Sequence, residues 1–504
     1  MPVRATIGGL AAAIPGSRVI GPTTTAVSGV AYDSRQVRAG DLFAALRGVD
    51  FDGHAFVDDA ASRGAAALLV ETPVSSPLPQ IVASNSRAAL AKAAATLFER
   101  PSDSIGVIGV TGTDGKTTAA HLIDHILRAV GERTGLIGTV AIRISDDEER
   151  HESRQTTPES SDVQRYLRQM ADGGAAWAVL EATSHGLAMH RLDEVRFRIG
   201  AVTNVTHEHL DFHGSREAYV RAKAILFERV GSEGGVAVVN ADDPGAREMQ
   251  PFAAGATIVS YSLSGRDADL RAKRVRCGAD GSRFDLEAGE AGRATVAMPL
   301  IGEFNVANAL CAAGVALATG AGLDEVVCAL ESAPAVPGRM AAIDLGQPFS
   351  VIVDYAHTPE ALEKVLRLLR RLHPSGRLIA VFGSAGERDV QKRPVQGRVS
   401  AELADVSVVT SEDPRHEDAD AIIAQIAAGA EAAGAEPGKA LFCLTDRRDA
   451  IAFAIGLAGP GDCVLLAGKG HERSIIWGRE KAPWDEAEAA REALADAGYA
   501  GQLS

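Results

Sequence analysis

The chain has 504 residues, more than one hydrophobic core normally organises, so we expect two to four domains. Its formal net charge of -15 argues against a general nucleic-acid surface, because such a surface needs Lys and Arg to neutralise phosphates. No apolar run reaches the roughly 18 residues of a membrane span, and the five scattered cysteines show no zinc-ligand spacing, so we expect a cytoplasmic protein with buried, reduced thiols, no signal peptide and no membrane insertion.

The first 105 residues mix short apolar runs with turn signals. They end in an Ala-rich helical stretch, residues 86–100, which stops before Pro101. This pattern predicts a small N-terminal α/β domain over residues 1–105.

A strand, a glycine-rich loop and a helix follow in direct succession. Residues 105–110 read as a buried strand, 111–116 as the loop, and 117–130 as a helix that Gly131 ends. Later apolar runs at 177–180, 200–203 and 236–239 alternate with helical stretches. The alternation predicts a central domain, residues 106–335, built on a parallel doubly wound sheet.

Two prolines and a glycine at residues 334–338 mark the second boundary, so the third domain spans 336–504. A helix expected at 360–372 carries apolar residues on one face, as packing on a sheet requires. The expected strands are 351–353, 378–382, 406–410 and 464–467, and polar motifs follow them at Asp354, 383–388, 412–415 and 468–472. Because ligands bind at the carboxyl ends of strands in such sheets, this Rossmann-like domain should gather the four motifs at one edge.

The central loop reads Gly112-Thr113-Asp114-Gly115-Lys116-Thr117-Thr118. Between a strand and a helix, this pattern is typical of a phosphate-binding loop: backbone NH groups hold phosphate oxygens, the lysine meets the terminal phosphates, and the first threonine after it reaches Mg²⁺. The spacing departs from the general pattern because Val110 stands at its first glycine. The alternative is a glycine-rich turn without a ligand.

Glu181 ends one central strand, and His209 lies in the stretch 204–214 that follows the next strand. A carboxylate and an imidazole near the phosphates would complete a Mg²⁺ site together with water. Histidine is an unusual Mg²⁺ ligand, so the residues alone also allow a structural His209. Zinc lacks a suitable fourth ligand.

With these motifs the chain resembles the Mur ligase family, and within it the branch that adds the third residue of the peptidoglycan stem peptide. The motifs that carry the resemblance run through all three expected domains: 33–35, 112–118, 156–158, 181–187, 204–214, 304–306, 338–340, 354–359, 383–394, 413–415 and 468–472. The resemblance implies that ATP phosphorylates the D-glutamate carboxylate of UDP-N-acetylmuramoyl-L-alanyl-D-glutamate. The amine of an incoming diamino acid then attacks the acyl phosphate.

The resemblance also assigns metal and catalytic residues. Thr117, Glu181 and His209 map to ligands of Mg²⁺ and phosphate, and Lys116 and His209 to catalysis. Lys223 falls where the family carries a lysine carbamylated by CO₂ (N6-carboxylysine), whose negative charge can bind a divalent cation. Without the resemblance, Lys223 would read as a solvated lysine on an amphipathic helix.

Substrate contacts carry over in the same way. The resemblance assigns the ATP base and ribose to Asn305 and Asn308, with Arg339 and Asp354 from the third domain. Closure of that domain onto the nucleotide is therefore expected. The UDP-sugar peptide falls to Ser34, His54, Thr156, Thr157, Ser184 and Arg191. Taken singly, either asparagine could instead form hydrogen bonds at the start of a helix, and each Ser or Thr could be a helix cap or a turn residue.

The incoming amino acid should meet residues of the third domain: Arg388, Glu412, Asp413, Arg415, Gly468 and Glu472. In the family an Asp-Asn-Pro-Arg motif accompanies meso-diaminopimelate, because Arg grips the distal carboxylate with two hydrogen bonds. Here the stretch reads Glu412-Asp413-Pro414-Arg415, with Asp in place of Asn. The extra charge would either pair with Arg415 or favour the distal ammonium of lysine or ornithine. We expect meso-diaminopimelate.

Other readings explain less of the chain. A P-loop switch or motor ATPase would explain residues 112–118 but not the motifs of the third domain. A catalytically inactive relative should have lost one of Lys116, Glu181, His209 or Lys223, and all four are present. A folylpolyglutamate or cyanophycin-type ligase is the alternative within the family. We expect a monomer that binds only small-molecule substrates.

Overall fold

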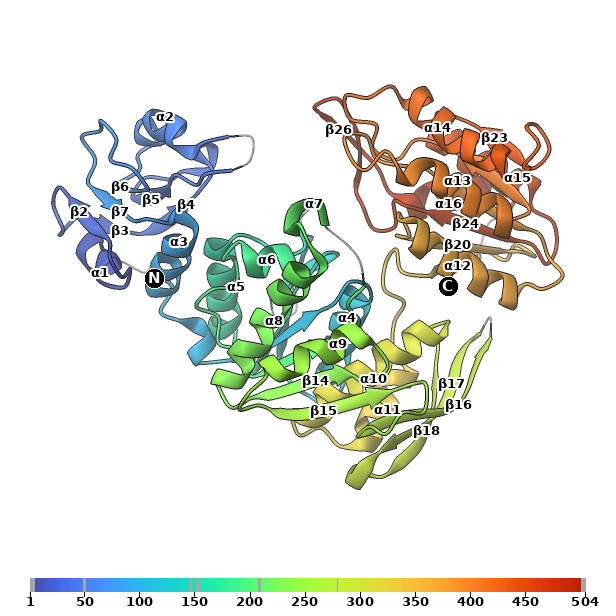
Figure 1. The fold of residues 1–504 in the computed structure, drawn as a ribbon, viewed down its shortest axis with the longest axis horizontal. Helices are drawn as coiled ribbons and strands as arrows, with labels where there is room; N and C mark the ends of the chain where they lie inside the picture. The colour runs from blue at the N-terminus through green and yellow to red at the C-terminus, as the bar shows by residue number, and fades with distance from the viewer. Residues whose placement is uncertain are drawn as a thin grey trace. The chain divides into compact units, whose positions relative to one another are not determined.

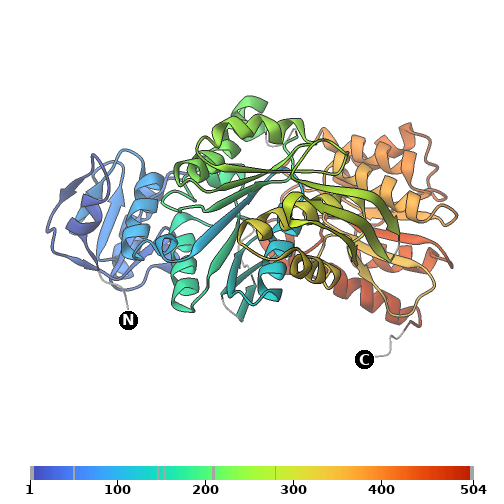
Figure 2. The ribbon, with the colours of Figure 1, turned by 90° about the horizontal axis from the view of Figure 1, so that it is seen from below.

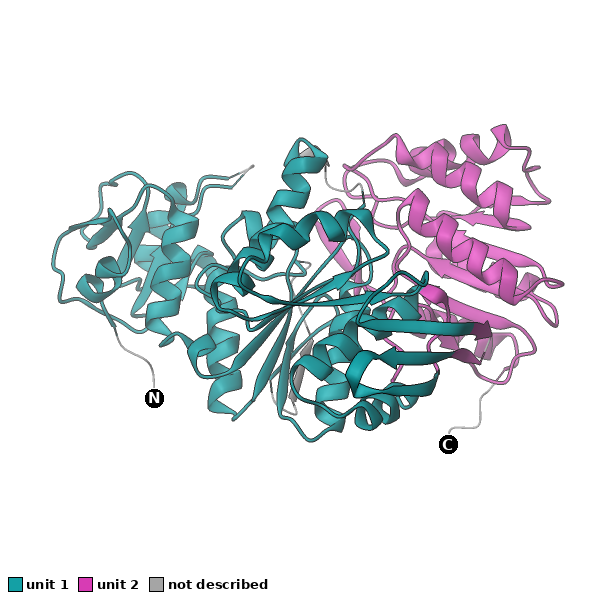
Figure 3. Ribbon diagram, turned by 60° about the horizontal axis from the view of Figure 1, so that its bottom comes forward, with its two compact units in different colours: residues 1–275, 284–297, 304–332 teal, residues 276–283, 298–303, 333–504 magenta. Residues whose placement is uncertain are grey.

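The computed structural model describes residues 5–48, 51–144, 147–150, 155–206, 210–278 and 280–499. Its contacts divide the chain into two compact units, shown in Figure 3. The first unit holds residues 1–275, 284–297 and 304–332, and the second holds 276–283, 298–303 and 333–504. Among the described residues, no helix combines the length and apolar character that crossing a membrane requires.

The N-terminal part of the first unit is a five-stranded sheet with helices packed on it. Strands β4 (Gly29–Ala31), β5 (Asp41–Ala44), β6 (Ala67–Val70) and β7 (Gln80–Val82) run parallel, and β2 (Arg18–Ile20) joins β7 antiparallel. The other elements are β1 (Ala5–Thr6), β3 (Ala26–Val27), α1 (Ile7–Ala12), α2 (Val57–Ser62) and α3 (Ser86–Leu97). Helix α3 begins at Ser86 because the Asn85 side chain accepts hydrogen bonds from two amides of its first turn.

An eleven-stranded sheet forms the centre of the first unit, in the order β11-β10-β9-β12-β8-β13-β14-β15-β16-β17-β18. From β9 through β16 neighbouring strands pair parallel, and β10 and β11 add antiparallel at one edge. The strands are β8 (Gly106–Thr111), β9 (Thr134–Ile137), β10 (Ala141–Ile144), β11 (Asp147–Arg150), β12 (Trp177–Glu181), β13 (Ile199–Val202), β14 (Val236–Asn240), β15 (Thr257–Ser262), β16 (Leu270–Gly278), β17 (Gly281–Ala288) and β18 (Arg293–Met298).

Helices cover both faces of the central sheet. In Figure 2 the green helices α8 and α9 lie on one side of the strands, and α4 (cyan) lies with α10 and α11 (olive) on the other. Their bounds are α4 (Lys116–Ala129), α5 (Ser160–Asp172), α6 (Ser184–Ala188), α7 (Leu210–His213), α8 (Arg216–Ser232), α9 (Pro244–Met249), α10 (Glu303–Ala318) and α11 (Leu323–Glu331). Because both faces are covered, strands such as β8 and β12 are buried almost throughout.

The second unit is built on a six-stranded sheet, ordered β19-β20-β24-β21-β22-β23, in which only β19 pairs antiparallel. Its strands are β19 (Ala341–Ile343), β20 (Ser350–Asp354), β21 (Leu378–Phe382), β22 (Val406–Val409), β23 (Leu441–Cys443) and β24 (Cys463–Ala467), with a separate hairpin of β25 (Ser474–Trp477) and β26 (Glu480–Pro483). Figure 1 shows these elements in orange and red.

Alternate residues of these strands enter two different cores. Ile352 and Ala380 pack with α12 (Pro359–Leu372), α13 (Lys392–Leu403) and α14 (Ala419–Ala432). Val351 and Ile379 pack with α15 (Arg447–Leu457) and α16 (Glu486–Asp496). The sheet is therefore covered on both faces, as a doubly wound domain requires.

The predicted α/β fold class is confirmed, and the structure corrects two details. The helix expected at 86–100 ends at Leu97. The cysteines are all unpaired, but only Cys311 and Cys463 are buried, so the prediction of buried thiols was wrong for Cys328 and Cys443. Cys443 lies on the edge strand β23. Cys328 lies on an exposed part of α11, whose residues Val326 and Ala329 are buried.

Candidate active site

The loop between β8 and α4 needs glycine at two positions. Gly115, which directly precedes α4, has φ +81°, and a Cβ there would lie 2.4 Å from Oδ1 of Asn308. At Gly112, a Cβ would lie 1.9 Å from Oγ1 of Thr203. Neighbouring side chains therefore approach this backbone more closely than any larger residue would permit.

Lys116 folds back over the same loop. Its Nζ donates hydrogen bonds to the carbonyl oxygens of Gly112 at 3.0 Å and Thr113 at 2.7 Å. Asn204, just after β13, fixes the loop from the other side: its Oδ1 accepts from the Asp114 amide at 2.9 Å, and its carbonyl from the Thr113 amide at 2.8 Å. Thr118 is buried in the first turn of α4. An ammonium group thus lies against a fixed loop at the N-terminus of a helix, an arrangement suited to phosphate oxygens.

Glu181 lies at the carboxyl end of β12 and is only 1 % exposed. Its carboxylate accepts from Oγ1 of Thr117 at 2.9 Å, and from the amide and Oγ1 of Thr139 at 2.7 and 3.0 Å. Oγ1 of Thr139 is also hydrogen-bonded to Oγ1 of Thr156 at 3.0 Å. Thr117 and Glu181 therefore place several oxygen atoms close together, and oxygen atoms are the ligands that Mg²⁺ prefers.

Lys223 is buried on α8, with 1 % of its surface exposed. Its Nζ donates to the Gly112 carbonyl at 2.6 Å and lies 4.6 Å from the centre of the Tyr219 ring. The alternative of a solvated lysine is therefore excluded, because this amine points at the phosphate-type loop. His209 lies outside the described residues. Among those that the structure describes, no three His, Cys, Asp or Glu side chains gather as a metal site.

Thr157, Ser184 and Arg191 surround the end of β12. Oγ1 of Thr157 donates to the Glu181 carbonyl at 2.7 Å, and Nη1 of Arg191 donates to the Thr157 carbonyl at 3.1 Å. Nε of Arg191 pairs with Glu159 at 3.0 Å, and Ser184 is buried at the start of α6. The structure thus brings together the four residues predicted for the muramoyl peptide, Thr156 included through its bond to Thr139.

Ser34 and His54 follow the parallel strands β4 and β5, and so belong to the same edge of the N-terminal sheet. Ser34 is buried at the start of a short 3-10 helix. Nε2 of His54 accepts from the Glu71 amide at 3.0 Å, so Nδ1 carries the proton and donates to Asp52 at 2.6 Å. The imidazole is held in one tautomer.

The four residues predicted for the adenosine side are divided between the two units. In the first unit, Asn308 lies against Gly115 and donates from Nδ2 to Oδ1 of Asn305 at 3.3 Å, both being buried on α10. In the second unit, Asp354 ends β20 and accepts from the amides of Met340 and Ala356, each at 2.8 Å. The Arg339 guanidinium lies 4.7 Å from the centre of the Tyr355 ring.

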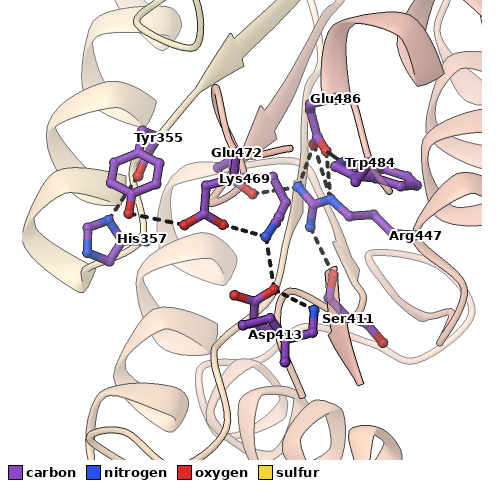
Figure 4. A network of polar contacts seen from close by, with 11 residues as sticks. Tyr355, His357, Ser411, Asp413, Arg447, Lys469, Glu472, Trp484 and Glu486 are labelled. Carbon is purple, nitrogen blue, oxygen red and sulfur yellow. Dashed lines mark hydrogen bonds and ion pairs between the residues drawn. The ribbon is translucent and has the colours of Figure 1, made fainter. Parts of the chain in front are cut away.

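The polar motifs of the second unit meet at one edge of its sheet, as predicted from their strand ends. Lys469, just after β24, is fully buried; its Nζ pairs with Oδ1 of Asp413 at 3.0 Å and also with Oε2 of Glu472 (Figure 4). The Tyr355 hydroxyl donates to Oε1 of Glu472 at 3.5 Å. Gly468, with φ +100°, donates its amide to the Asp354 carbonyl at 3.2 Å.

Glu412 and Arg415 lie beside this network. Burial raises the pKa of the Glu412 carboxyl, and its Oε2 has no hydrogen-bond partner among the described residues. Nε of Arg415 is buried and likewise lacks a partner there. Arg388 is exposed, but its loop is near, because the Gly386 amide donates to the Asp413 carbonyl at 2.8 Å.

The sequence did not single out Thr139 or Lys469. Thr139 follows the short strand β9, whose four residues form too short an apolar run to predict a strand. Lys469 stands between two glycines directly after a strand, which was a usable signal, but its partner Asp413 lies 56 positions earlier. The buried pair of Arg447 with Glu486 was missed for the same reason, since the two lie 39 positions apart (Figure 4).

Comparison with known proteins finds the same family in each segment. The chain matches "Mur ligase family, catalytic domain" over residues 26–102, "Mur ligase middle domain" over 110–316 and "Mur ligase, glutamate ligase domain" over 338–470. It is 48 % identical to a UDP-N-acetylmuramyl-tripeptide synthetase of Roseiflexus sp., covering 95 % of this chain and 97 % of the relative.

Two further relatives carry a more specific name. The chain is 41 % identical to a UDP-N-acetylmuramoyl-L-alanyl-D-glutamate–2,6-diaminopimelate ligase of Geobacillus kaustophilus, with 92 % and 94 % of the two chains covered. A solved structure of a ligase of that name is similar with a TM-score of 0.67 and 30 % identity, over 98 % and 99 % of the two chains.

Proposed function

The chain belongs to the Mur ligase family and is an ATP-dependent acid–amino-acid ligase of peptidoglycan synthesis, and from this premise we propose its substrates and the roles of its residues. The acid is the D-glutamate carboxylate of UDP-N-acetylmuramoyl-L-alanyl-D-glutamate, and the amine is a diamino acid, meso-diaminopimelate. The enzyme works in the cytoplasm as a monomer. Its domains are 1–105 for the UDP substrate, 106–335 for ATP and 336–504 for the amino acid.

The observation that carries this proposal is the position of Lys116 and Glu181 beside one glycine loop. Residues Gly112 to Thr118 hold the triphosphate, with the Lys116 ammonium on the terminal phosphate oxygens. Asn305 and Asn308 take the adenine side, while Arg339 and Asp354 of the second unit serve phosphate and ribose. A carboxylate is a poor electrophile, and transfer of the terminal phosphoryl group to it supplies the leaving group that amide formation needs.

Mg²⁺ fits the oxygen donors beside the loop. Thr117 and Glu181 would hold it, together with His209 and a carbamylated Lys223. When bound, the ion supplies positive charge to the phosphate oxygens. Lys223 is suited to carbamylation because its buried Nζ points at the Gly112 carbonyl: the amine adds to CO₂, forms an N–C bond and loses a proton. The product is an anion where an ammonium would repel the metal.

The dipeptide lies along the end of β12. Thr156, Thr157, Ser184 and Arg191 offer hydroxyl groups and one guanidinium to its amide and carboxylate oxygens, while Ser34 and His54 take the uridine side. Arg388, Glu412, Asp413, Arg415, Gly468 and Glu472 receive the diamino acid. There the Arg415 guanidinium meets a carboxylate, and Glu472 meets an ammonium.

The direct test is ligation by the purified enzyme. It is given ATP, Mg²⁺ and the UDP-linked dipeptide, with meso-diaminopimelate, L-lysine or L-ornithine in separate reactions. We expect ADP release and a product whose mass contains diaminopimelate. A preference for lysine or ornithine would replace the proposed amine. If the enzyme released no ADP and formed no new peptide with any of the three amines, the proposed ligation would be refuted.

A further inference from the structure

Asp413 belongs to the proposed amino-acid site, and the structure places a buried cation against it. Lys469 is 0 % exposed, and its Nζ lies 3.0 Å from Oδ1 of Asp413 (Figure 4). The same Oδ1 accepts from the Ile476 amide at 3.0 Å. The Lys469 ammonium also pairs with Glu472. One lysine therefore contacts two carboxylates of the proposed amino-acid site.

Arg415 stands two residues after Asp413 but is not drawn into this network. Its backbone is fixed to the β25–β26 hairpin, because its amide donates to the Ile476 carbonyl at 2.9 Å and its carbonyl accepts from the Gly478 amide at 2.7 Å. Within the described ranges, no carboxylate forms an ion pair with Arg415, and its Nε is buried without a hydrogen bond. A guanidinium in this state has donors to offer to a ligand.

We propose that Lys469 is a positioning residue: it neutralises Asp413, so that the Arg415 guanidinium stays available for a carboxylate of the incoming amino acid. This inference rests on the proposed function. A buried carboxylate without Lys469 would take the nearest strong donor, and a guanidinium two residues away offers two parallel hydrogen bonds to it. With Lys469 in place, the charge of Asp413 is compensated. A bound ligand then meets a side chain without net charge, as it would with an asparagine.

The surrounding charges agree with this assignment. Glu412 is also buried beside Gly468, with its Oε2 3.5 Å from where a Cβ on that glycine would lie. Burial raises the pKa of the Glu412 carboxyl, and the charges of Lys392 and Lys469 oppose that rise. Before the amino acid binds, Lys469 pairs with two anions, Asp413 and Glu472.

The test is a double-mutant cycle of Lys469→Met and Asp413→Asn, with steady-state kinetics on the amino acid that the wild type uses best. We expect Lys469→Met to raise the KM for the amino acid by about tenfold or more, since Asp413 then competes for Arg415, and to leave the KM for ATP unchanged. Because Asp413 is itself assigned to the amino-acid site, Asp413→Asn alone serves as the reference, and Lys469→Met should raise the KM for the amino acid much less in the Asp413→Asn background than in the wild type.

Two further variants separate positioning from general damage to the domain. Lys469→Arg keeps the charge and should retain a KM near that of the wild type. Lys439→Met makes the same substitution at an exposed ion pair of this unit, and should change neither KM. The same rise in the KM for the amino acid on Lys469→Met in both backgrounds would overturn the proposal.

If Lys469→Met does not fold, Lys469→Gln takes its place in the cycle. An equal rise in the KM for the amino acid when Lys469→Gln is made in the wild type and in Asp413→Asn would take the assigned role from Lys469. Failure of the proposed function looks different, because the wild-type enzyme would then form no peptide with any amine.

Discussion

Gly115 is the residue at which the phosphate-type loop can be tested without removing a charge. It has φ +81°, and a Cβ would lie 2.4 Å from Oδ1 of Asn308. Gly131 has a similar φ of +91° but open space around it. Alanine at either position should cost about 1–2 kcal/mol of stability through backbone strain, whereas only Gly115→Ala should displace Asn308 and the loop.

We therefore expect Gly115→Ala to raise the KM for ATP by about tenfold or more, and Gly131→Ala to leave it unchanged. Steady-state kinetics with ATP as the varied substrate, together with thermal unfolding of both variants, measures the two effects. Equal changes in KM would contradict the role of the loop.

Lys223 provides the second test at this scale. Its amine is buried against the Gly112 carbonyl, so a carbamate there would carry a negative charge into the phosphate site. Lys223→Ala should abolish ligation, a loss of at least about 100-fold, because both the anion and its metal contact are lost. A short carboxylate such as acetate should restore part of the activity, and measuring product with and without it checks this.

The matched control is Lys273→Ala, which removes an exposed lysine of the same unit. It should ligate at the normal rate with no response to acetate. Full activity of Lys223→Ala, or the absence of any carboxylate rescue, would remove the carbamate from the proposal.

Glu412 gives a pH dependence whose sign follows from its burial. Its folded pKa is raised above the ordinary value of 4.5, so its neutral form favours folding at low pH, and this contribution is lost as the pH rises through the folded pKa. Glu412→Gln should therefore be more stable than the wild type at pH 8, and the difference should vanish near pH 4. Denaturant unfolding at both pH values measures it; a less stable variant at pH 8 would indicate that the carboxylate is paired.

At the scale of elements, the sequence predicted the strands with polar ends well. Leu378–Phe382 was predicted with its exact bounds, and β12 and β24 to within one residue, because a buried apolar run followed by a charged or glycine residue ends a strand locally. The short strands β9 and β23 lack such runs. The alternating strands β16 to β18 form the far edge of the central sheet and carry no motif, so no local signal tied them to it.

Helix α15 and helix α16 are joined by a pair that only the fold reveals. Nη2 of Arg447 donates to Oε1 of Glu486 at 2.5 Å and to the Ala467 carbonyl at 2.8 Å, and both side chains are fully buried. Arg447→Met should destabilise the second unit by about 3–5 kcal/mol, because it leaves a buried carboxylate without its cation. The neighbouring pair of Arg448 with Glu492 is about half exposed, so Arg448→Met should cost at most about 1 kcal/mol.

Chemical unfolding followed by tryptophan fluorescence measures this difference. Trp484 reports on the site directly, because its Nε1 donates to Oε2 of Glu486 at 2.7 Å. Equal losses in the free energy of unfolding of the two variants would show that burial of the Arg447–Glu486 pair adds nothing to stability.

At the scale of the whole molecule, the three-part organisation and the edges of the sheets followed from the order of motifs along the chain. The partners across those edges did not. Thr139 bonds to Glu181 over 42 positions, and Lys469 to Asp413 over 56. Such pairs depend on which strands become neighbours, and strand order is decided by packing of the whole sheet rather than by any local pattern. The sequence thus names candidate residues one by one, and these stay predictions, whereas the charge balance among them depends on the fold.

Glu159 joins the N-terminal and central parts of the first unit beside the proposed dipeptide site. It is 6 % exposed and pairs at 3.0 Å with Arg87 of α3 and at 3.0 Å with Arg191, which also holds the Thr157 carbonyl. Glu159→Gln should leave Arg191 less well oriented. We expect the KM for the UDP-linked dipeptide to rise by about tenfold, the size of one lost hydrogen bond to a charged group, with the KM for ATP unchanged.

Glu194 provides the control, because its substitution loosens the same junction without touching Arg191. It accepts from Lys92 of α3 at 2.6 Å and from Arg100 at 2.9 Å, so it also ties the N-terminal part to the central part, but it lies in a different charge cluster from Arg191. If Glu159 acts through Arg191, Glu194→Gln should lower stability slightly and leave the KM for the dipeptide within about twofold of the wild type. If Glu194→Gln raises that KM as much as Glu159→Gln does, the junction itself governs dipeptide binding and Arg191 is not oriented for it.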